Sequence, residues 1–129
     1  TRDPARYGTQ TLAEIMEAVG TRAATMGHEV TWRQSDVEGD LLGWIRAARG
    51  EGFAAIVANP GALSHYSIAL RDAVEACGLP LIEVHMTNVF AREPFRRTSV
   101  VSPVAATVIV GAGAGGYHLA LEALPWITR

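Results

Sequence analysis

The sequence has little cysteine and no excess of charge of either sign. One cysteine, Cys77, stands among 129 residues. An internal disulfide is therefore excluded, and nothing in the cysteine content argues against a reducing compartment. The 11 basic and 13 acidic residues give a net charge of −2. This balance does not suit nucleic-acid binding, because that function needs a clustered basic surface.

Long apolar runs are also missing. The most apolar stretch, residues 100–116, is interrupted by Ser102, Pro103 and several glycines. A bilayer-spanning helix needs about 20 continuous apolar residues, so we expect no membrane segment. No basic-then-apolar segment of the kind that directs secretion opens the sequence. The composition therefore fits a cytoplasmic protein.

What remains is the composition of a folded domain. Apolar residues make up 49% of the sequence and charged residues 19%, which is typical of globular proteins. A chain of this length can bury roughly two thirds of its unfolded surface, so it needs no disulfide or metal to fold. No internal repeat or linker divides it, and we expect a single domain over residues 1–129.

The apolar pattern predicts that helices and strands alternate. Apolar residues recur at helical spacing in four segments, namely 12–26, 37–50, 67–77 and 115–124, the last ended by Pro125. Alternating or continuous short apolar runs predict strands at 28–34, 54–58, 81–85 and 107–110. This order favours an α/β fold, with a mostly parallel sheet and helices on both faces. In such folds the ligand site lies at the carboxyl ends of the strands.

Glu83 and His85 stand at the carboxyl end of the predicted strand 81–85. Because side chains alternate along a strand, both should point to the same face of the sheet. A carboxylate beside an imidazole can fix the tautomer of the ring and raise its pKa, which suits a general acid. The alternative is a Glu–His pair at the surface.

Three further segments carry polar side chains that could bind a ligand. Residues 59–67, with Asn59 and His65, could hold hydroxyl groups, or could simply form a turn and a helix cap. The loop 92–97 brings arginines that could hold a carboxylate or diol, or that could be solvated. At the start, Tyr7 could act as a base if Arg2 or Arg6 lowered its pKa from about 10, unless the terminus is flexible.

Two patterns are weaker than they look. Residues 111–116 match G-x-G-x-x-G, but the dinucleotide fingerprint needs a following strand and an acidic residue about 20 positions later. Neither follows before Arg129, so we expect these glycines to serve close packing and a tight turn. The four histidines show no zinc-ligand spacing and Cys77 has no cysteine partner, so we predict no metal site and a core position for Cys77.

Several segments together resemble one known family. They are residues 2–8 (Arg-Asp-Pro…Tyr-Gly), 33–35, 38–41, Asn59-Pro60 with Ser64-His65, 69–72 and, most specifically, 82–89 running into 91–96. Several independent motifs occur in the right order, so chance similarity is improbable. Over essentially its whole length the sequence resembles the type II dehydroquinases (3-dehydroquinate dehydratases).

The resemblance implies a fold, an activity and an assembly. The fold would be flavodoxin-like. The activity would be the trans elimination of water from 3-dehydroquinate, through an enolate, to give 3-dehydroshikimate, with neither a metal nor an organic cofactor. The protein would be a homo-oligomer, a dodecamer built from trimers, and would serve aromatic biosynthesis or quinate breakdown.

The resemblance also implies roles for individual residues. Tyr7 would be the base that takes the C2 proton, and Arg2 the cation that keeps it ionised. His85 would be the acid at the departing C1 hydroxyl, oriented by Glu83. Residues 1–8 would form a mobile lid over the active site.

The substrate would be held by a second group of residues, again by resemblance. Its hydroxyls would be bound by Asn59, His65 and Arg96, and its carboxylate by the backbone of Met86 and Thr87 with help from the Thr87 hydroxyl. Asp72 would reach the site of a neighbouring subunit.

The sequence also departs from the family pattern. The family begins with a central strand and an Asn-Gly-Pro-Asn turn, and both are missing here. We therefore predict roughly 10–20 further residues upstream in the natural protein, enough for one strand and its turn. Thr87 stands where serine is usual, and Phe90 and Val100 make their loop more apolar.

Two other functions stay open at this stage. The chain could be a non-catalytic relative that binds a polyhydroxylated acid or serves as a scaffold subunit. It could also be a flavin-binding module, which only fold analogy supports. Arg2, Tyr7, Glu83 and His85 occur together, which favours the enzyme, because a binder needs no acid–base pair.

Overall fold

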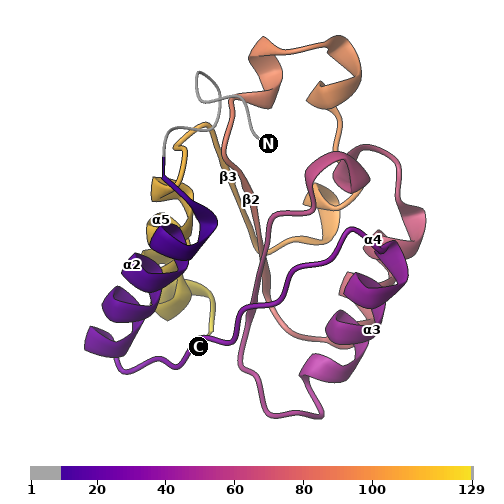
Figure 1. The fold of residues 1–129 in the computed structure, drawn as a ribbon. Coiled ribbons are helices and arrows are strands. Elements are labelled where there is room, and N and C mark those ends of the chain that lie inside the picture. Colours follow the sequence, from indigo (N-terminus) through magenta and orange to yellow (C-terminus); the bar gives the residue numbers. More distant parts are fainter. Residues whose placement is uncertain (1–9, 129) are drawn as a thin grey trace.

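The computed structural model describes residues 10–128. A parallel sheet of order β1–β2–β3 is formed by β1 (Ile56–Ala58), β2 (Leu81–His85) and β3 (Thr107–Val110). Two pairs of helices flank it, α3 (Glu38–Ala48) with α4 (Ile68–Cys77) on one side and α2 (Leu12–Thr25) with α5 (Gly115–Ile127) on the other (Figure 1). The predicted α/β fold with a parallel sheet and helices on both faces is confirmed.

The middle strand, β2, is buried along its whole length. Ala58 pairs with Glu83 on one side, and His85 pairs with Val110 on the other. The three strands are parallel, so their carboxyl ends meet at one edge of the sheet, where Asn59, Met86 and Gly111 follow. The loop beyond β2 contains two short 3₁₀ helices, η2 (Val89–Ala91) and η3 (Pro94–Arg97).

Alternate residues of β2 belong to different layers of the core. Leu81 packs with Leu70, Val74 and Val101 on the α3–α4 side. Ile82 and Val84 pack with Ala120 of α5 on the opposite side. By the same alternation, Glu83 and His85 share the α4 side of the sheet with Leu81.

The strand predicted at residues 28–34 is wrong. These residues form neither a helix nor a strand, and they make no ladder with any described strand. Val30 and Trp32 alternate because both pack against the apolar cluster of α2 and α5, where the Trp32 ring meets Tyr117 edge-on at 5.6 Å. An alternating pattern therefore indicates only that one side of a segment is buried, whereas a strand also needs a hydrogen-bonded neighbour.

A hollow of about 540 Å³ lies between this segment and β1. Its wall includes Val30, Trp32, Val57, Met86 and Leu124. The Trp32 indole N–H is buried and has no hydrogen-bond partner among the residues that the structure describes. The strand predicted upstream of residue 1 stays a prediction.

The last helix is longer than predicted. Pro125 was expected to end it, yet α5 continues to Ile127. A proline interrupts a helix by removing one N–H bond, but here the last turn is retained, since the Thr128 N–H still donates to the Leu124 carbonyl at 3.0 Å. None of the helices within residues 10–128 is long and apolar enough to cross a membrane.

The glycines of residues 111–116 serve the close packing and tight turn that were predicted. Gly111 and Gly113 have φ values of +86° and +58°, which residues with a Cβ rarely adopt. Gly116 is buried, and a Cβ added to it would lie 2.8 Å from the Cγ1 of Val84. The first turn of α5 therefore rests directly on β2.

Gly116→Ala is expected to lower the free energy of unfolding by about 1–3 kcal/mol, because the added methyl overpacks the contact with Val84. Gly115→Ala is the matched control, since a Cβ there meets nothing within 4 Å. Alanine also favours helix at that position by up to about 1 kcal/mol. Urea unfolding of both variants measures the difference, and equal stabilities would contradict the packing argument.

Candidate active site

The site is built around a buried Glu–His pair at the end of β2. Glu83 has no exposed surface and His85 is 6% exposed. His85 Nε2 lies 2.5 Å from Glu83 Oε2. The prediction that the two share a face is confirmed, and the alternative of a surface pair is wrong because both side chains are buried.

Two serines complete the surroundings of the Glu83 carboxylate. The Ser99 hydroxyl donates to Oε2 at 2.9 Å, and the Ser102 hydroxyl donates to Oε1 at 2.8 Å. Ser102 begins the 3₁₀ helix η4 (Ser102–Val104). Sequence reasoning missed both serines as partners of Glu83, because nothing in a spacing of 16 or 19 residues indicates a contact.

These donors decide the ionisation of Glu83. Burial by itself raises the pKa of the carboxyl, but the hydrogen bonds from His85, Ser102 and Ser99 and the charge of His85 together outweigh it, and the pKa lies below its usual value. Glu83 is therefore a carboxylate at neutral pH. Since a carboxylate only accepts, His85 Nε2 must carry the proton of their shared hydrogen bond.

His65 lies beside His85. The two rings are nearly parallel, with centroids 6.3 Å apart and an interplanar angle of 18°. His65 Nδ1 lies 2.8 Å from the Thr98 carbonyl oxygen, which can only accept, so Nδ1 carries a proton. Nε2 is then the ring nitrogen left to meet a ligand, and in the uncharged ring it accepts, which suits a substrate hydroxyl.

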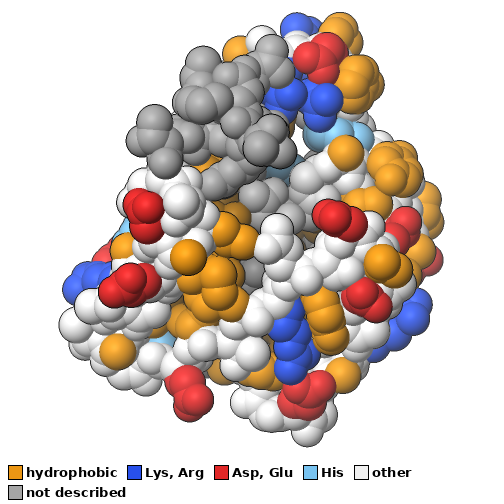
Figure 2. Space-filling view, viewed as in Figure 1, with side chains coloured by type: hydrophobic (Ala, Val, Ile, Leu, Met, Phe, Trp, Pro, Cys, Tyr) orange, Lys and Arg blue, Asp and Glu red, His pale blue; other side chains and the backbone are white. Residues whose placement is uncertain are grey.

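The loop after β2 brings arginines to the same edge. Arg92 Nη1 donates to the Thr87 hydroxyl at 3.4 Å. Arg96 donates from Nε to Glu93 at 2.5 Å and lies over the Phe95 ring at 4.8 Å from its centroid. The hydrogen bond from Arg96 lowers the pKa of Glu93. Figure 2 shows basic and histidine side chains gathered at this end of the molecule, whereas elsewhere on that face acidic and basic groups are interspersed.

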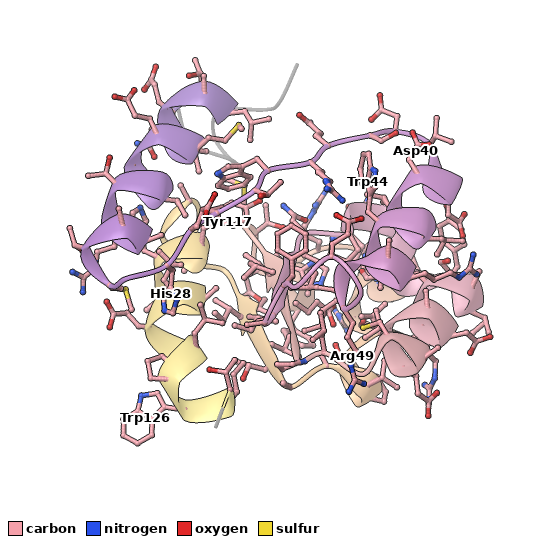
Figure 3. All side chains as sticks on the ribbon, turned by 90° about the horizontal axis from the view of Figure 1, so that it is seen from below. His28, Asp40, Trp44, Arg49, Tyr117 and Trp126 are labelled. Carbon is pink, nitrogen blue, oxygen red and sulfur yellow. The ribbon has the colours of Figure 1, made fainter. Side chains whose placement is uncertain are left out.

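The end of β1 places Asn59 near α5. Asn59 Nδ2 donates to the Tyr117 hydroxyl at 3.0 Å, and its Oδ1 accepts from the Gly61 N–H at 3.3 Å. Tyr117, labelled in Figure 3, thus orients the amide. Sequence reasoning did not single out Tyr117, whose only signal was its place in the apolar pattern of α5.

The remaining predicted residues differ in where they lie. Met86 is buried directly after β2, and its carbonyl accepts from the Gly113 N–H at 2.9 Å. Asp72 is exposed on α4 and is not part of the Glu83 hydrogen-bond network. Arg2, Tyr7 and the predicted lid of residues 1–8 lie outside the described residues.

Cys77 occupies the core position predicted for it. It is buried, and its thiol donates to the Val74 carbonyl at 3.2 Å. Within residues 10–128, no group of three or more His, Cys, Asp or Glu side chains could hold a metal ion.

The arrangement can move protons. A buried carboxylate holds an imidazole, and a second imidazole with a settled tautomer stacks beside it, at the edge where α/β proteins bind ligands. The fold and site together define an α/β protein with an acid–base centre at the carboxyl edge of its sheet.

Comparison with known proteins then places the chain. The family model described as dehydroquinase class II matches residues 1–125. The chain belongs to this family, which is a family of hydro-lyases with a flavodoxin-like α/β fold.

Individual relatives agree. The chain is 51% identical over 122 residues to 3-dehydroquinate dehydratase 2 of Pseudomonas putida, covering 95% of this chain and 81% of the relative. It is 52% identical over 121 residues to 3-dehydroquinate dehydratase of Salinispora arenicola, covering 94% of this chain and 84% of the relative. The crystal structure of type II dehydroquinase from Butyrivibrio crossotus is similar with a TM-score of 0.94 at 38% identity, covering 96% of this chain and 86% of that one. The crystal structure of type II dehydroquinase from Propionibacterium acnes is similar with a TM-score of 0.89 at 42% identity, covering 95% of this chain and 84% of that one.

The ionised state of Glu83 predicts a dependence of stability on pH. Its pKa is lower in the folded chain than the ordinary value of 4.5, so its stabilising contribution is complete above that value. The contribution is lost as the pH falls through the lower pKa of the folded state. Glu83→Gln should therefore unfold more easily at neutral pH and lose less stability on acidification.

Urea unfolding midpoints at about pH 6 and about pH 3 measure this difference. Glu17→Gln, which removes an exposed carboxylate of α2, is the charge-matched control. A Glu83→Gln chain whose midpoint falls on acidification as steeply as that of the parent would show that Glu83 is not held ionised.

Proposed function

We propose that this protein is a 3-dehydroquinate dehydratase, which removes water from 3-dehydroquinate to give 3-dehydroshikimate. The observation that carries the proposal is the buried Glu83–His85 pair at the carboxyl edge of β2, in a chain that belongs to the class II dehydroquinase family. The names of the relatives at about 50% identity support the same substrate.

The reaction is a trans elimination next to a ketone. A base takes the proton from C2, the electrons of that C–H bond form an enolate, and the enolate then expels the C1 hydroxyl as it collapses to the enone. The leaving hydroxyl takes a proton from an acid and departs as water. Base, acid and stabilisation of the enolate are what the protein must supply.

His85 is the acid in this proposal. Its Nε2–H is engaged by Glu83, so the proton for the leaving hydroxyl comes from Nδ1. With Nε2–H bonded to Glu83, that proton is present only in the imidazolium form of the ring. Donation leaves a neutral ring whose Nε2–H still bonds Glu83, and solvent returns the lost proton after product leaves.

The base is Tyr7, by the resemblance to the family. Arg2 is the cation that lowers the pKa of the Tyr7 hydroxyl, so that a phenolate is available near neutral pH. By the same resemblance, residues 1–8 would close over bound substrate as a lid. A lid that excludes water suits this chemistry, because both proton transfers then take place in an environment of low dielectric constant.

The substrate is held by groups that the fold already orients. Asn59 and His65 bind its hydroxyls, the first oriented by Tyr117 and the second by the Thr98 carbonyl. Arg96 joins them on exchanging its contact with Glu93 for the substrate. The backbone of Met86 and Thr87, with the Thr87 hydroxyl, binds the carboxylate.

Assembly completes the site in this proposal. Asp72, exposed on α4, reaches the site of a neighbouring subunit in a dodecamer built from trimers. By the resemblance to the family, the proposed chemistry uses neither a metal nor an organic cofactor. The dodecamer and the cytoplasmic location stay predictions, as does the choice between biosynthesis and quinate breakdown.

The test follows the enone absorbance of dehydroshikimate after 3-dehydroquinate is mixed with the protein and a chelator. We expect a steady rise. Tyr7→Phe and His85→Ala should each lower kcat by roughly 10²–10⁴-fold, with much smaller changes in KM, because proton transfer is lost while binding groups remain. His28→Ala, which removes an exposed histidine outside the site, should retain activity.

Two results would contradict the proposal. A flat trace from folded protein that binds 3-dehydroquinate would favour the non-catalytic binder. Variants that lose binding but keep kcat would contradict the roles given to Tyr7 and His85.

A further inference from the structure

The Glu83 carboxylate has one serine hydroxyl on each of its oxygens. Ser99 donates to Oε2, which also receives His85 Nε2, and Ser102 donates to Oε1. A carboxylate with no exposed surface cannot use water to stabilise its charge, so its hydrogen-bond donors must do so. The two serines therefore bear directly on where the proton of the pair lies.

Ser99 is held in a way that permits only one role towards Glu83. Its hydroxyl oxygen accepts from the N–H groups of Val101 and Ser102, each at 3.1 Å. A serine hydroxyl has two lone pairs and one proton, so both acceptor positions are filled from the backbone. The remaining O–H must donate, and its geometry directs it to Glu83 Oε2.

Ser102 acts on the other oxygen. Its hydroxyl donates to Oε1 and bonds to no backbone group among residues 10–128. If Glu83 instead took the proton of the pair, the donor bonds of both serines would weaken, because a neutral carboxyl is a poorer acceptor than a carboxylate. The serines thus favour the charged pair over a neutral pair in which the proton has moved from His85 to Glu83.

We propose that Ser99 and Ser102 are positioning residues that keep the shared proton on His85 by holding Glu83 as a carboxylate. The proposal rests on the proposed role of His85 as the acid. If the shared proton moved to Glu83, the ring would be neutral and would keep its Nδ1 proton, but it would be a far weaker acid towards the leaving hydroxyl. Neither serine touches the reacting atoms, and each acts through Glu83. His65 is the titratable side chain whose ring stacks on His85.

Ser102→Ala is the cleaner test, because Ser99 also holds the local backbone. Loss of a hydrogen bond to a charged group should lower kcat roughly tenfold, with KM nearly unchanged. The ¹⁵N shifts of the His85 ring, recorded without substrate at the pH of highest kcat, should move from imidazolium towards neutral values. A variant that only loosened the local structure would not lower kcat at constant KM and would not move the His85 shifts towards neutral values.

Two further variants sharpen the test. Ser102→Thr keeps the hydroxyl and should recover most of kcat and the imidazolium shifts. Ser35→Ala is the matched control, since it removes another serine–carboxylate bond, 2.6 Å from Ser35 Oγ to Asp40 Oδ2, outside the Glu83 network. It should leave kcat and the His85 shifts unchanged. If Ser102→Ala does not fold, Ser102→Cys, with its weaker donor, should give an intermediate loss.

The outcomes separate this proposal from the proposed function. Unchanged kcat and unchanged His85 shifts in folded Ser102→Ala or Ser102→Cys would overturn the role of the serines. The role of the serines would also be overturned if Ser102→Thr restored neither kcat nor the imidazolium shifts of His85. If the parent protein has no dehydratase activity, the proposed function fails, yet the His85 shifts of the substrate-free variants still decide whether the serines hold the proton on His85.

Discussion

The site depends on one buried negative charge. Glu83 lies in the middle of the central strand with no contact with solvent, so its charge must be balanced from within the fold. The donors come from β2 itself, through His85, and from the segment that returns to the sheet before β3, through Ser99 and Ser102. One carboxylate therefore fixes both the imidazole ring and the path of the chain that encloses it.

The polar side chains at the same edge of the sheet are oriented by hydrogen bonds between distant parts of the chain. The Thr98 carbonyl fixes the tautomer of His65, and Tyr117 of α5 fixes the amide of Asn59. Gly116 lets α5 approach β2 closely enough to bring Tyr117 there, because any side chain would meet Val84. Polar groups in the site are thus held by the fold before any ligand arrives, which reduces the cost of ordering them on binding.

Sequence reasoning succeeded where the signal is local. Strand 81–85 was predicted from a short apolar run, and its period of two placed Glu83 and His85 on one face. Helices were predicted over 12–26 and 67–77 from apolar residues at helical spacing, and α2 and α4 begin within one residue of those predictions. Identification of the family likewise used contiguous motifs, of which residues 82–96 were the most specific.

Sequence reasoning failed where a structure depends on a partner elsewhere in the chain. Residues 28–34 have the right alternation for a strand, but alternation cannot supply a neighbouring strand. Ser99 and Ser102 look like ordinary loop residues until the fold brings them to Glu83. The end of α5 is a different case, because the helix continues past Pro125 through a local bond from the Thr128 N–H to the Leu124 carbonyl.

The burial of Cys77 has a consequence for handling the protein. Its side chain lies in the core, and its thiol donates to the Val74 carbonyl at 3.2 Å. It is the single cysteine of the sequence, and a thiol reagent cannot reach it while the core stays closed. The rate at which such a reagent modifies the chain therefore reports how often this part of the core opens.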